Sequence, residues 1–188
     1  MTVMMKATIC ELREEPAEFE QDWQALADHV RRMASNLVVL PEMTFCPWFA
    51  RSRAFDPAVW QAAVSAHDAW LARLADMAPA TVVGSRPVND GAGRFNEGFV
   101  WSPAGGYVRT HRKYYLPDDE GFWEASWYQR GDGGFAVCET GALRIGFMIC
   151  TEQWFLEHAR AYGRAGAQLI VTPRSTLQST VDKWLVDG

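Results

Sequence analysis

Apolar residues recur along this chain at two spacings, one typical of helices and the other typical of strands. Phe19, Trp23, Leu26 and Val30 follow one another at intervals of three and four, which predicts an amphipathic helix that opens after Pro16. The helical spacing returns in three further segments: 57–78, 152–166 and 175–186. These segments predict four helices.

Short apolar runs between these segments predict strands. They lie at 5–12, 36–43, 81–88, 94–102, 106–115, 134–140, 143–150 and 167–173. The alternation of such strands with helices predicts a layered α/β or α+β sheet architecture and disfavours a helical bundle. No repeat, linker or low-complexity segment divides the chain, so residues 1–188 are expected to form a single domain.

Composition is that of an ordinary soluble globular protein. Of the 188 residues, 48% are apolar and 22% are charged, which supports a sizeable core and excludes disordered or collagen-like classes. A formal net charge of -5, with scattered Lys and Arg residues, disfavours a nucleic-acid partner. Because the sequence carries neither a signal-peptide pattern nor an apolar run of roughly 20 residues, we expect a cytoplasmic protein without a membrane partner.

The cysteines and histidines do not form a metal site in the sequence. Four cysteines occur, none in a C-x-x-C pair: Cys10, Cys46, Cys138 and Cys150. We expect free thiols, because a chain of this size needs no disulfide framework. His111 and His158 lack the spacing of metal ligands, so metal catalysis is disfavoured and no cofactor is expected.

Cys150 has the most informative position of the four cysteines. It closes the predicted strand 143–150, and a helical pattern follows it. The N–H groups and dipole of a helix start favour a thiolate and could bind an oxyanion, whereas the alternative is a small buried core residue. Cys10 and Cys138 lie inside apolar patterns and are expected in the core; Cys46 either lines a pocket or packs.

Glu42 and Lys113 also close predicted strands. Taken singly, Glu42 is a loop acid or a desolvated general base, Lys113 is a surface lysine, and Glu124 is a loop acid among aromatic residues. Because ligands gather at the carboxyl ends of strands in open layered sheets, the three strand-end residues Glu42, Lys113 and Cys150 are expected to converge. A thiolate, a carboxylate and an ammonium together can attack a carbonyl carbon, move its protons and stabilise its oxyanion.

Three blocks in this order resemble the carbon-nitrogen hydrolase (nitrilase) superfamily: NLVVLPEM with Glu42, HRKYYLPDDEGFWE with Lys113, and LRIGFMICTEQWFLEHAR with Cys150. The resemblance covers nearly the whole chain. It implies a four-layer α-β-β-α sandwich, a catalytic Glu-Lys-Cys trio that needs no cofactor, and Glu124 as a second acid in the site. It also implies a homo-oligomer that assembles through the outer helices.

The sequence departs from the family pattern in two ways. After Cys150 the family commonly has Asp and Pro where this chain has Glu152 and Leu156, and the arginines of carbamoyl-D-amino-acid hydrolases are missing. The chain is also shorter than family domains, so the second sheet is expected to be incomplete at its C-terminal end, with an apolar edge uncovered.

The resemblance implies hydrolysis of a non-peptide amide or carbamoyl C–N bond, with a nitrile as an alternative small-molecule substrate. The backbone N–H of Thr151 would help Lys113 to bind the oxyanion. Aromatic residues near these blocks indicate an apolar pocket or a Trp-rich core: Phe45, Trp48, Phe49, Trp123, Trp127 and Trp154. The other alternative is a shortened, inactive family member that acts as a binding or assembly partner.

Overall fold

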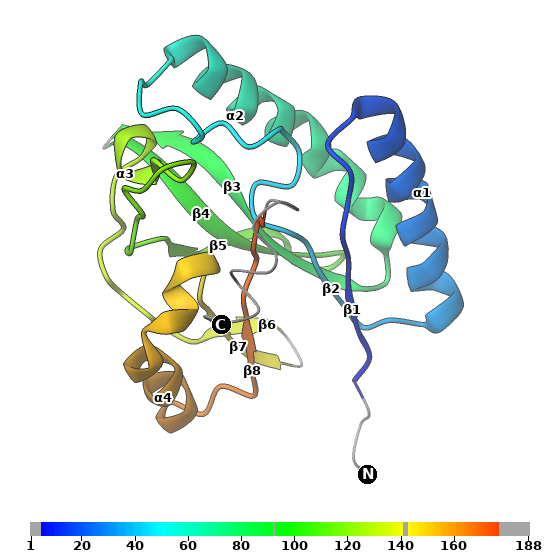
Figure 1. The fold of residues 1–188 in the computed structure, drawn as a ribbon. Helices are drawn as coiled ribbons and strands as arrows, with labels where there is room; N and C mark the ends of the chain where they lie inside the picture. Colours follow the sequence, from blue (N-terminus) through cyan, green and yellow to red (C-terminus); the bar gives the residue numbers. More distant parts are fainter. Residues whose placement is uncertain (1–4, 92, 141–142, 177–188) are drawn as a thin grey trace.

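The structure is a computed structural model that describes residues 5–91, 93–140 and 143–176 (Figure 1). The larger sheet has the order β1 (Ala7–Ile9), β2 (Leu37–Val39), β3 (Thr81–Asp90), β4 (Gly93–Ser102) and β5 (Gly106–Arg112). The smaller sheet has the order β6 (Cys138–Thr140), β7 (Leu143–Phe147) and β8 (Leu169–Val171). β1, β2 and β3 run parallel to one another, as do β7 and β8, and the other neighbouring strands are antiparallel.

The helical segments of the described chain are α1 (Pro16–Met33), α2 (Pro57–Leu71), the 3-10 helix η1 (Ala72–Met77), α3 (Glu124–Trp127), the 3-10 helix η2 (Cys150–Trp154) and α4 (Leu156–Arg164). α1 begins with proline, whose missing N–H needs no partner in a first turn. α2 begins after Asp56, whose carboxylate accepts a hydrogen bond from the Ala58 N–H at 2.8 Å. The two long helices therefore start where the sequence provides start signals.

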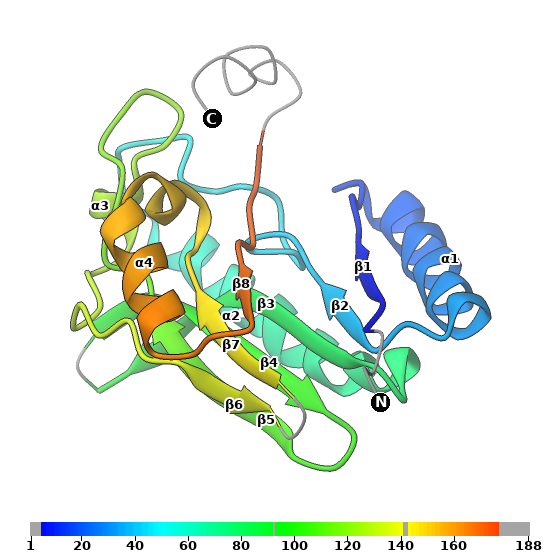
Figure 2. The same ribbon diagram turned by 90° about the horizontal axis from the view of Figure 1, so that it is seen from below.

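The two sheets lie face to face, with α1 and α2 outside the larger sheet (Figures 1 and 2). The side chains between α1 and that sheet include Trp23, Leu26, Val38 and Val82. The side chains between the sheets include Leu37, Val83, Val100, Ile145, Phe147 and Val171. The central strands β2, β3 and β4 thus bury one row of side chains under helices and the other row against the smaller sheet.

α4 covers the other face of the smaller sheet through Tyr162. A Cβ added at Gly146 of β7 would lie 2.6 Å from the Tyr162 ring, so only glycine lets the helix approach this closely. The Tyr162 hydroxyl donates a hydrogen bond to the Phe147 carbonyl oxygen at 2.8 Å. The resulting order of helix, sheet, sheet and helix confirms the predicted α+β sandwich.

Several boundaries differ from the sequence-based predictions. The strand expected to reach Cys150 ends at Phe147, and the helix expected over 152–166 is divided at Phe155 into η2 and α4. The Phe155 ring stacks on Tyr115, with the ring centroids 3.5 Å apart. The spacing of apolar residues along the sequence does not predict this long-range contact. Residues 124–127, expected as a loop, form α3. The helix expected at 175–186 falls almost entirely outside the described residues.

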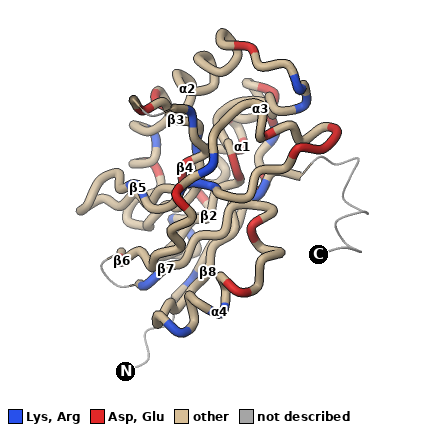
Figure 3. The backbone as a smooth tube through the Cα atoms, turned by 90° about the vertical axis from the view of Figure 1, so that its left-hand side faces the viewer, with Lys and Arg blue, Asp and Glu red and all other residues tan. Residues whose placement is uncertain are grey.

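The smaller sheet leaves one strand of the larger sheet uncovered. Ile9 of β1 pairs with Val39, which packs between the sheets, yet Ile9 is 81% exposed. Charges of both signs are interspersed along the backbone (Figure 3). In the part of the chain that the structure describes, no helix has the length and apolar character needed to cross a membrane.

Candidate active site

Glu42, Lys113 and Cys150 come together where β2, β5 and β7 end. The Lys113 Nζ lies 2.9 Å from Oε1 of Glu42, and all three side chains are buried. Met43, directly after Glu42, and Cys150 itself have left-handed backbone conformations, with φ of 52° and 51°. Such conformations are uncommon for residues with side chains and cluster at functional sites. Two of the converging segments therefore make a strained turn at the site.

Lys113 lies between two carboxylates. Its Nζ is 2.7 Å from Oε2 of Glu124, which opens α3, in addition to its contact with Glu42. Burial acts to lower the pKa of Lys113, but the carboxylates of Glu124 and Glu42 outweigh burial and raise it above the ordinary value. Burial also raises the pKa of Glu124 to about 7, and Lys113 offsets only part of this effect. The ammonium is thus held charged although the side chain is fully buried.

The surroundings of Cys150 favour its thiol form, in contrast to a helix start, which would favour the thiolate. Burial raises its pKa, and the neighbouring Glu42 carboxylate raises it further against the opposing charge of Lys113. η2 is a five-residue 3-10 helix, too short to compensate. Oε2 of Glu42 has no hydrogen-bond partner among the described residues, so a carboxylate oxygen is available to accept the thiol proton.

Asn96 of β4 is a site residue that the sequence analysis missed. Its side-chain Nδ2 donates a hydrogen bond to Oε1 of Glu42 at 2.8 Å, and its backbone oxygen accepts one from the Lys113 N–H at 2.9 Å. Asn96 is fully buried and therefore fixes the carboxylate relative to the strand that precedes Lys113. An asparagine inside an apolar strand pattern is the signal that points to it.

His67 of α2 supports the loop that carries Glu42, and the sequence analysis missed it too. Its Nε2 accepts a hydrogen bond from the Phe45 N–H at 3.2 Å, and its Nδ1 donates one to the Ala63 carbonyl oxygen at 2.8 Å. Burial lowers the pKa of His67 to about 3, so the ring is neutral and can accept in this way. Nothing in the helical pattern of residues 57–78 indicates this role.

The other predicted site residues differ in their burial and in their contacts. Thr151 is buried beside Cys150, and its hydroxyl donates a hydrogen bond to the Tyr115 carbonyl oxygen at 3.3 Å. Trp48 lines a cavity of about 50 Å³ beside Glu42. Trp123 is half-buried at the start of α3 under the Arg53 guanidinium, and Trp154 is exposed on η2.

The apolar pocket inferred from aromatic residues is largely a core. Phe45 packs with Trp23 under α1, while Phe49 and Trp127 belong to a second buried cluster with Trp48. These rings fill the space between α1, α2, α3 and the larger sheet, so the Trp-rich sequence reflects packing. Only one of the six aromatic residues, Trp48, borders the cavity at Glu42.

The other three cysteines differ from Cys150 in their surroundings. Cys46 lines the cavity at Glu42, and burial raises its pKa to about 12. Burial raises the pKa of Cys10 to about 12 as well, and Cys138 is half-buried on β6. No group of three or more His, Cys, Asp or Glu side chains in the described part of the chain could hold a metal ion. Among the described residues, the only thiol beside both a lysine and a glutamate of the cluster is Cys150.

Comparison with known proteins places this geometry in context. Residues 6–186 match the family described as carbon-nitrogen hydrolase. Over 63 residues, which are 34% of this chain and 21% of the relative, the sequence is 41% identical to N-carbamoylputrescine amidase of Solanum tuberosum. The chain therefore matches well under two thirds of that protein's length.

Two solved structures are similar in fold. A carbon-nitrogen hydrolase from Helicobacter pylori superposes with a TM-score of 0.75 at 22% identity, over 97% of this chain and 64% of that one. A mutant amidase from a Nesterenkonia species, with acrylamide added at its active site cysteine, gives a TM-score of 0.70 at 18% identity, over 97% and 72% of the two chains.

Proposed function

The chain belongs to the carbon-nitrogen hydrolase family, and from this premise we propose that it hydrolyses a non-peptide amide or carbamoyl C–N bond through a thioester at Cys150. The observation that carries the proposal is the buried contact of 2.9 Å between Lys113 and Glu42 beside the Cys150 thiol. A charged lysine without solvent contact is costly to maintain, and such groups cluster where chemistry needs them.

In the first half of the reaction, Oε2 of Glu42 accepts the thiol proton as the sulfur of Cys150 attacks the carbonyl carbon. A C–S bond forms while the C=O electron pair moves onto oxygen, where Lys113 Nζ and the N–H of Thr151 stabilise the charge. The C–N bond then breaks. The departing nitrogen takes the proton from Glu42 and leaves as ammonia, and the acyl group remains on Cys150.

In the second half, water gives a proton to Glu42 and attacks the thioester carbon. The C–S bond breaks, the sulfur regains the proton from Glu42, and the acid product leaves. Glu124 keeps Lys113 charged and oriented through the contact of 2.7 Å. The raised pKa of Cys150 fits this scheme, because the thiol then stays protonated until a substrate is in position.

The names of the relatives support the proposed substrate class. The small cavity beside Glu42 is lined by a second carboxylate, Glu14, but by neither Lys113 nor Cys150, so its size and charge do not define the substrate. The name of the potato relative refers to an amidase of a carbamoyl compound. A nitrile would require the same three residues and is the second candidate.

Ammonia release tests this proposal. The purified chain is assayed on small aliphatic amides, carbamoyl compounds and nitriles, next to Cys150→Ala and to Cys138→Ala, a matched control at a thiol away from the cluster. We expect release by the wild type and the control, and none by Cys150→Ala. Turnover by Cys150→Ala, or silence from a folded wild type, would contradict the proposal; the latter favours an inactive binding partner.

A further inference from the structure

Glu152 is a fully buried carboxylate that does not touch Lys113, Glu42 or Glu124, and the reaction scheme above does not use it. Its Oε2 accepts a hydrogen bond from the Ile149 N–H at 2.7 Å, and its Oε1 accepts one from the Tyr114 N–H at 2.8 Å. The Nε2 of His111 lies 2.8 Å from Oε2. One carboxylate thus receives three N–H groups from two separate segments.

The two segments are those that carry the proposed lysine and nucleophile. Tyr114 directly follows Lys113, and Ile149 directly precedes Cys150. His111 adds a second contact from the end of β5, and its other ring nitrogen, Nδ1, lies 3.3 Å from the Gly134 carbonyl oxygen. Glu152 therefore joins the residues next to both reacting groups.

Glu152 contacts residues that are distant in the sequence, which distinguishes it from an ordinary helix-capping residue. The contact with Ile149 is local, because Glu152 is only three residues away and caps the first turn of η2. The contacts with Tyr114 and His111 cross 38 and 41 residues. Capping needs only the first contact, and a buried charge without the others would be costly.

We propose that Glu152 is a positioning residue that sets the distance between Lys113 and Cys150 by binding both segments. The inference rests on the hydrolase function proposed above. A shift of about 1 Å between reacting groups can lower a rate on the order of 10²-fold, so a carboxylate that fixes this spacing affects kcat without touching the substrate. His111 assists by holding the carboxylate in place.

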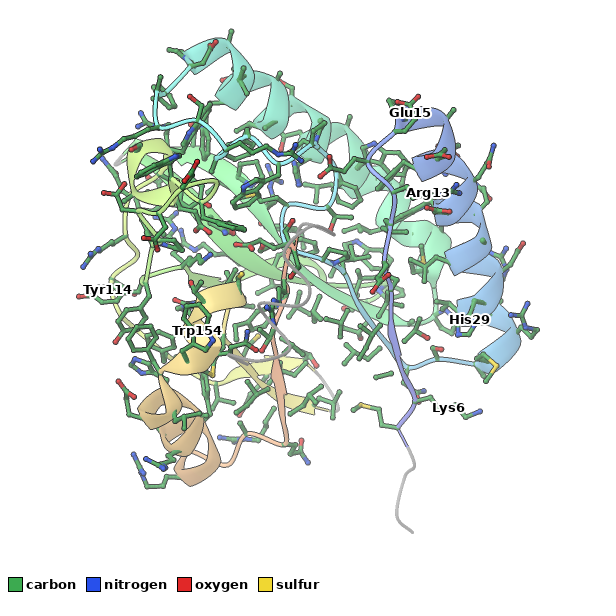
Figure 4. All side chains as sticks on the ribbon, viewed as in Figure 1. Lys6, Arg13, Glu15, His29, Tyr114 and Trp154 are labelled. Carbon is green, nitrogen blue, oxygen red and sulfur yellow. The ribbon has the colours of Figure 1, made fainter. Side chains whose placement is uncertain are left out.

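The fold does not depend on Glu152 alone. Thr151 and Phe155 also bind the segment after Lys113, through the hydrogen bond to Tyr115 and the stacked ring. Figure 4 shows Tyr114, from that segment, and Trp154 of η2 on the side of the molecule where α4 lies. These contacts keep the two segments together when Glu152 is changed. Substitutions of Glu152 therefore report on the spacing between Lys113 and Cys150.

The test compares Glu152→Gln and Glu152→Asp with Glu157→Gln, a matched control on the exposed side of α4. Glutamine has a single acceptor oxygen, so one backbone N–H loses its partner. Aspartate stays within reach of Ile149, three residues away, but withdraws by one methylene from Tyr114. We expect kcat on a hydrolysed amide to fall about 10- to 100-fold in both variants, with KM within about threefold, and no change in the control.

Amide hydrogen exchange provides a readout that does not need turnover. In Glu152→Asp the Tyr114 N–H should exchange faster while the Ile149 N–H stays protected; a residue that only caps η2 would leave Tyr114 unchanged. Wild-type kcat and Tyr114 protection in this variant would overturn the inference. If the wild type hydrolyses nothing, the proposed function fails, and faster Tyr114 exchange still establishes the link.

His111→Phe is the second variant, in case the Glu152 variants fold poorly. It keeps a ring that can stack on Phe135, whose centroid lies 4.7 Å from that of His111, and removes one of the three donors. We expect a smaller loss of kcat than in Glu152→Gln, on the order of tenfold. Unchanged kcat with unchanged Tyr114 exchange would count against the link.

Discussion

A surface ion-pair cluster and a buried one have the same composition, one cation between two carboxylates. The surface cluster is Arg73 with Glu20 and Asp76, and the buried cluster is Lys113 with Glu42 and Glu124. The distances are alike, 2.8 to 3.0 Å in the first and 2.7 to 2.9 Å in the second. The clusters differ in exposure: the surface side chains are 34% to 48% exposed, and the buried ones at most 1%.

This difference in exposure reverses the direction in which the pKa of a carboxylate shifts. Hydrogen bonds from Arg73 lower the pKa of Glu20 and of Asp76, as expected for a carboxylate with a cationic partner in water. In the buried cluster, burial outweighs the partner and raises the pKa of Glu124 to about 7. Ion-pair geometry alone therefore does not determine a charge state. The buried cluster costs free energy to assemble, which a site of chemistry explains better than stability does.

The largest predicted contrast comes from removing the cation of each cluster. Lys113→Met leaves two carboxylates buried without a cationic partner, so we expect a loss of about 3–5 kcal/mol in the free energy of unfolding at pH 7. Amide hydrolysis should fall on the order of 10²-fold or more, because the oxyanion loses its ammonium. Urea unfolding and ammonia release measure the two effects.

Arg73→Met is the matched control on the surface. We expect its melting temperature to stay within about 2 °C of the wild type, because exposed ion pairs contribute little, and its activity to be unchanged. Equal destabilisation by the two substitutions would remove the distinction between the clusters.

The pH dependence of stability should differ in sign between the two clusters. The pKa of Glu124 rises from 4.5 to about 7 on folding, so the native state binds more protons between these values. Stability contributed by the protonated carboxyl is present below pH 4.5 and is lost as the pH rises through about 7, to a total of about 3 kcal/mol. Glu124→Gln should remove this slope in urea unfolding between pH 4.5 and pH 7.

Asp76→Asn provides the opposite case. The pKa of Asp76 is lower in the folded state than in the unfolded state. The stability that its carboxylate contributes is therefore present above the unfolded-state pKa and is lost as the pH falls through the folded-state pKa. If the stability contributed by Glu124 and the stability contributed by Asp76 changed with pH in the same direction, burial would not be the dominant cause of the raised pKa of Glu124.

The smallest predicted effect is the response to salt. At an ionic strength of about 1 M the Debye length is roughly 3 Å, which screens exposed charges but not buried ones. The difference in melting temperature between the wild type and Glu20→Gln, about 2 °C or less at low salt, should therefore vanish in about 1 M NaCl. The destabilisation by Lys113→Met should persist. Differential scanning calorimetry at the two salt concentrations distinguishes these outcomes.

Local patterns predicted much of this fold. The three- and four-residue spacing that begins at Phe19 becomes α1, and the apolar runs at 81–88 and 94–102 lie within β3 and β4. The strand-end positions of Glu42 and Lys113 were also visible, and the structure brings these two side chains together with Cys150. These features depend on residues close in sequence, which is why period and turn chemistry suffice to find them.

Tertiary contacts decided the rest. Asn96 reaches Glu42 across 54 residues, Glu152 reaches Tyr114 across 38, and Phe155 leaves the helical pattern where its ring meets Tyr115. Whether Cys150 is a thiol or a thiolate depends on its burial and on the charges around it. Neither property can be found in the sequence segment that contains Cys150. The sequence by itself determined which side chains stand at the ends of strands. Only the folded chain set their protonation, because desolvation and partner charges arise when distant segments meet.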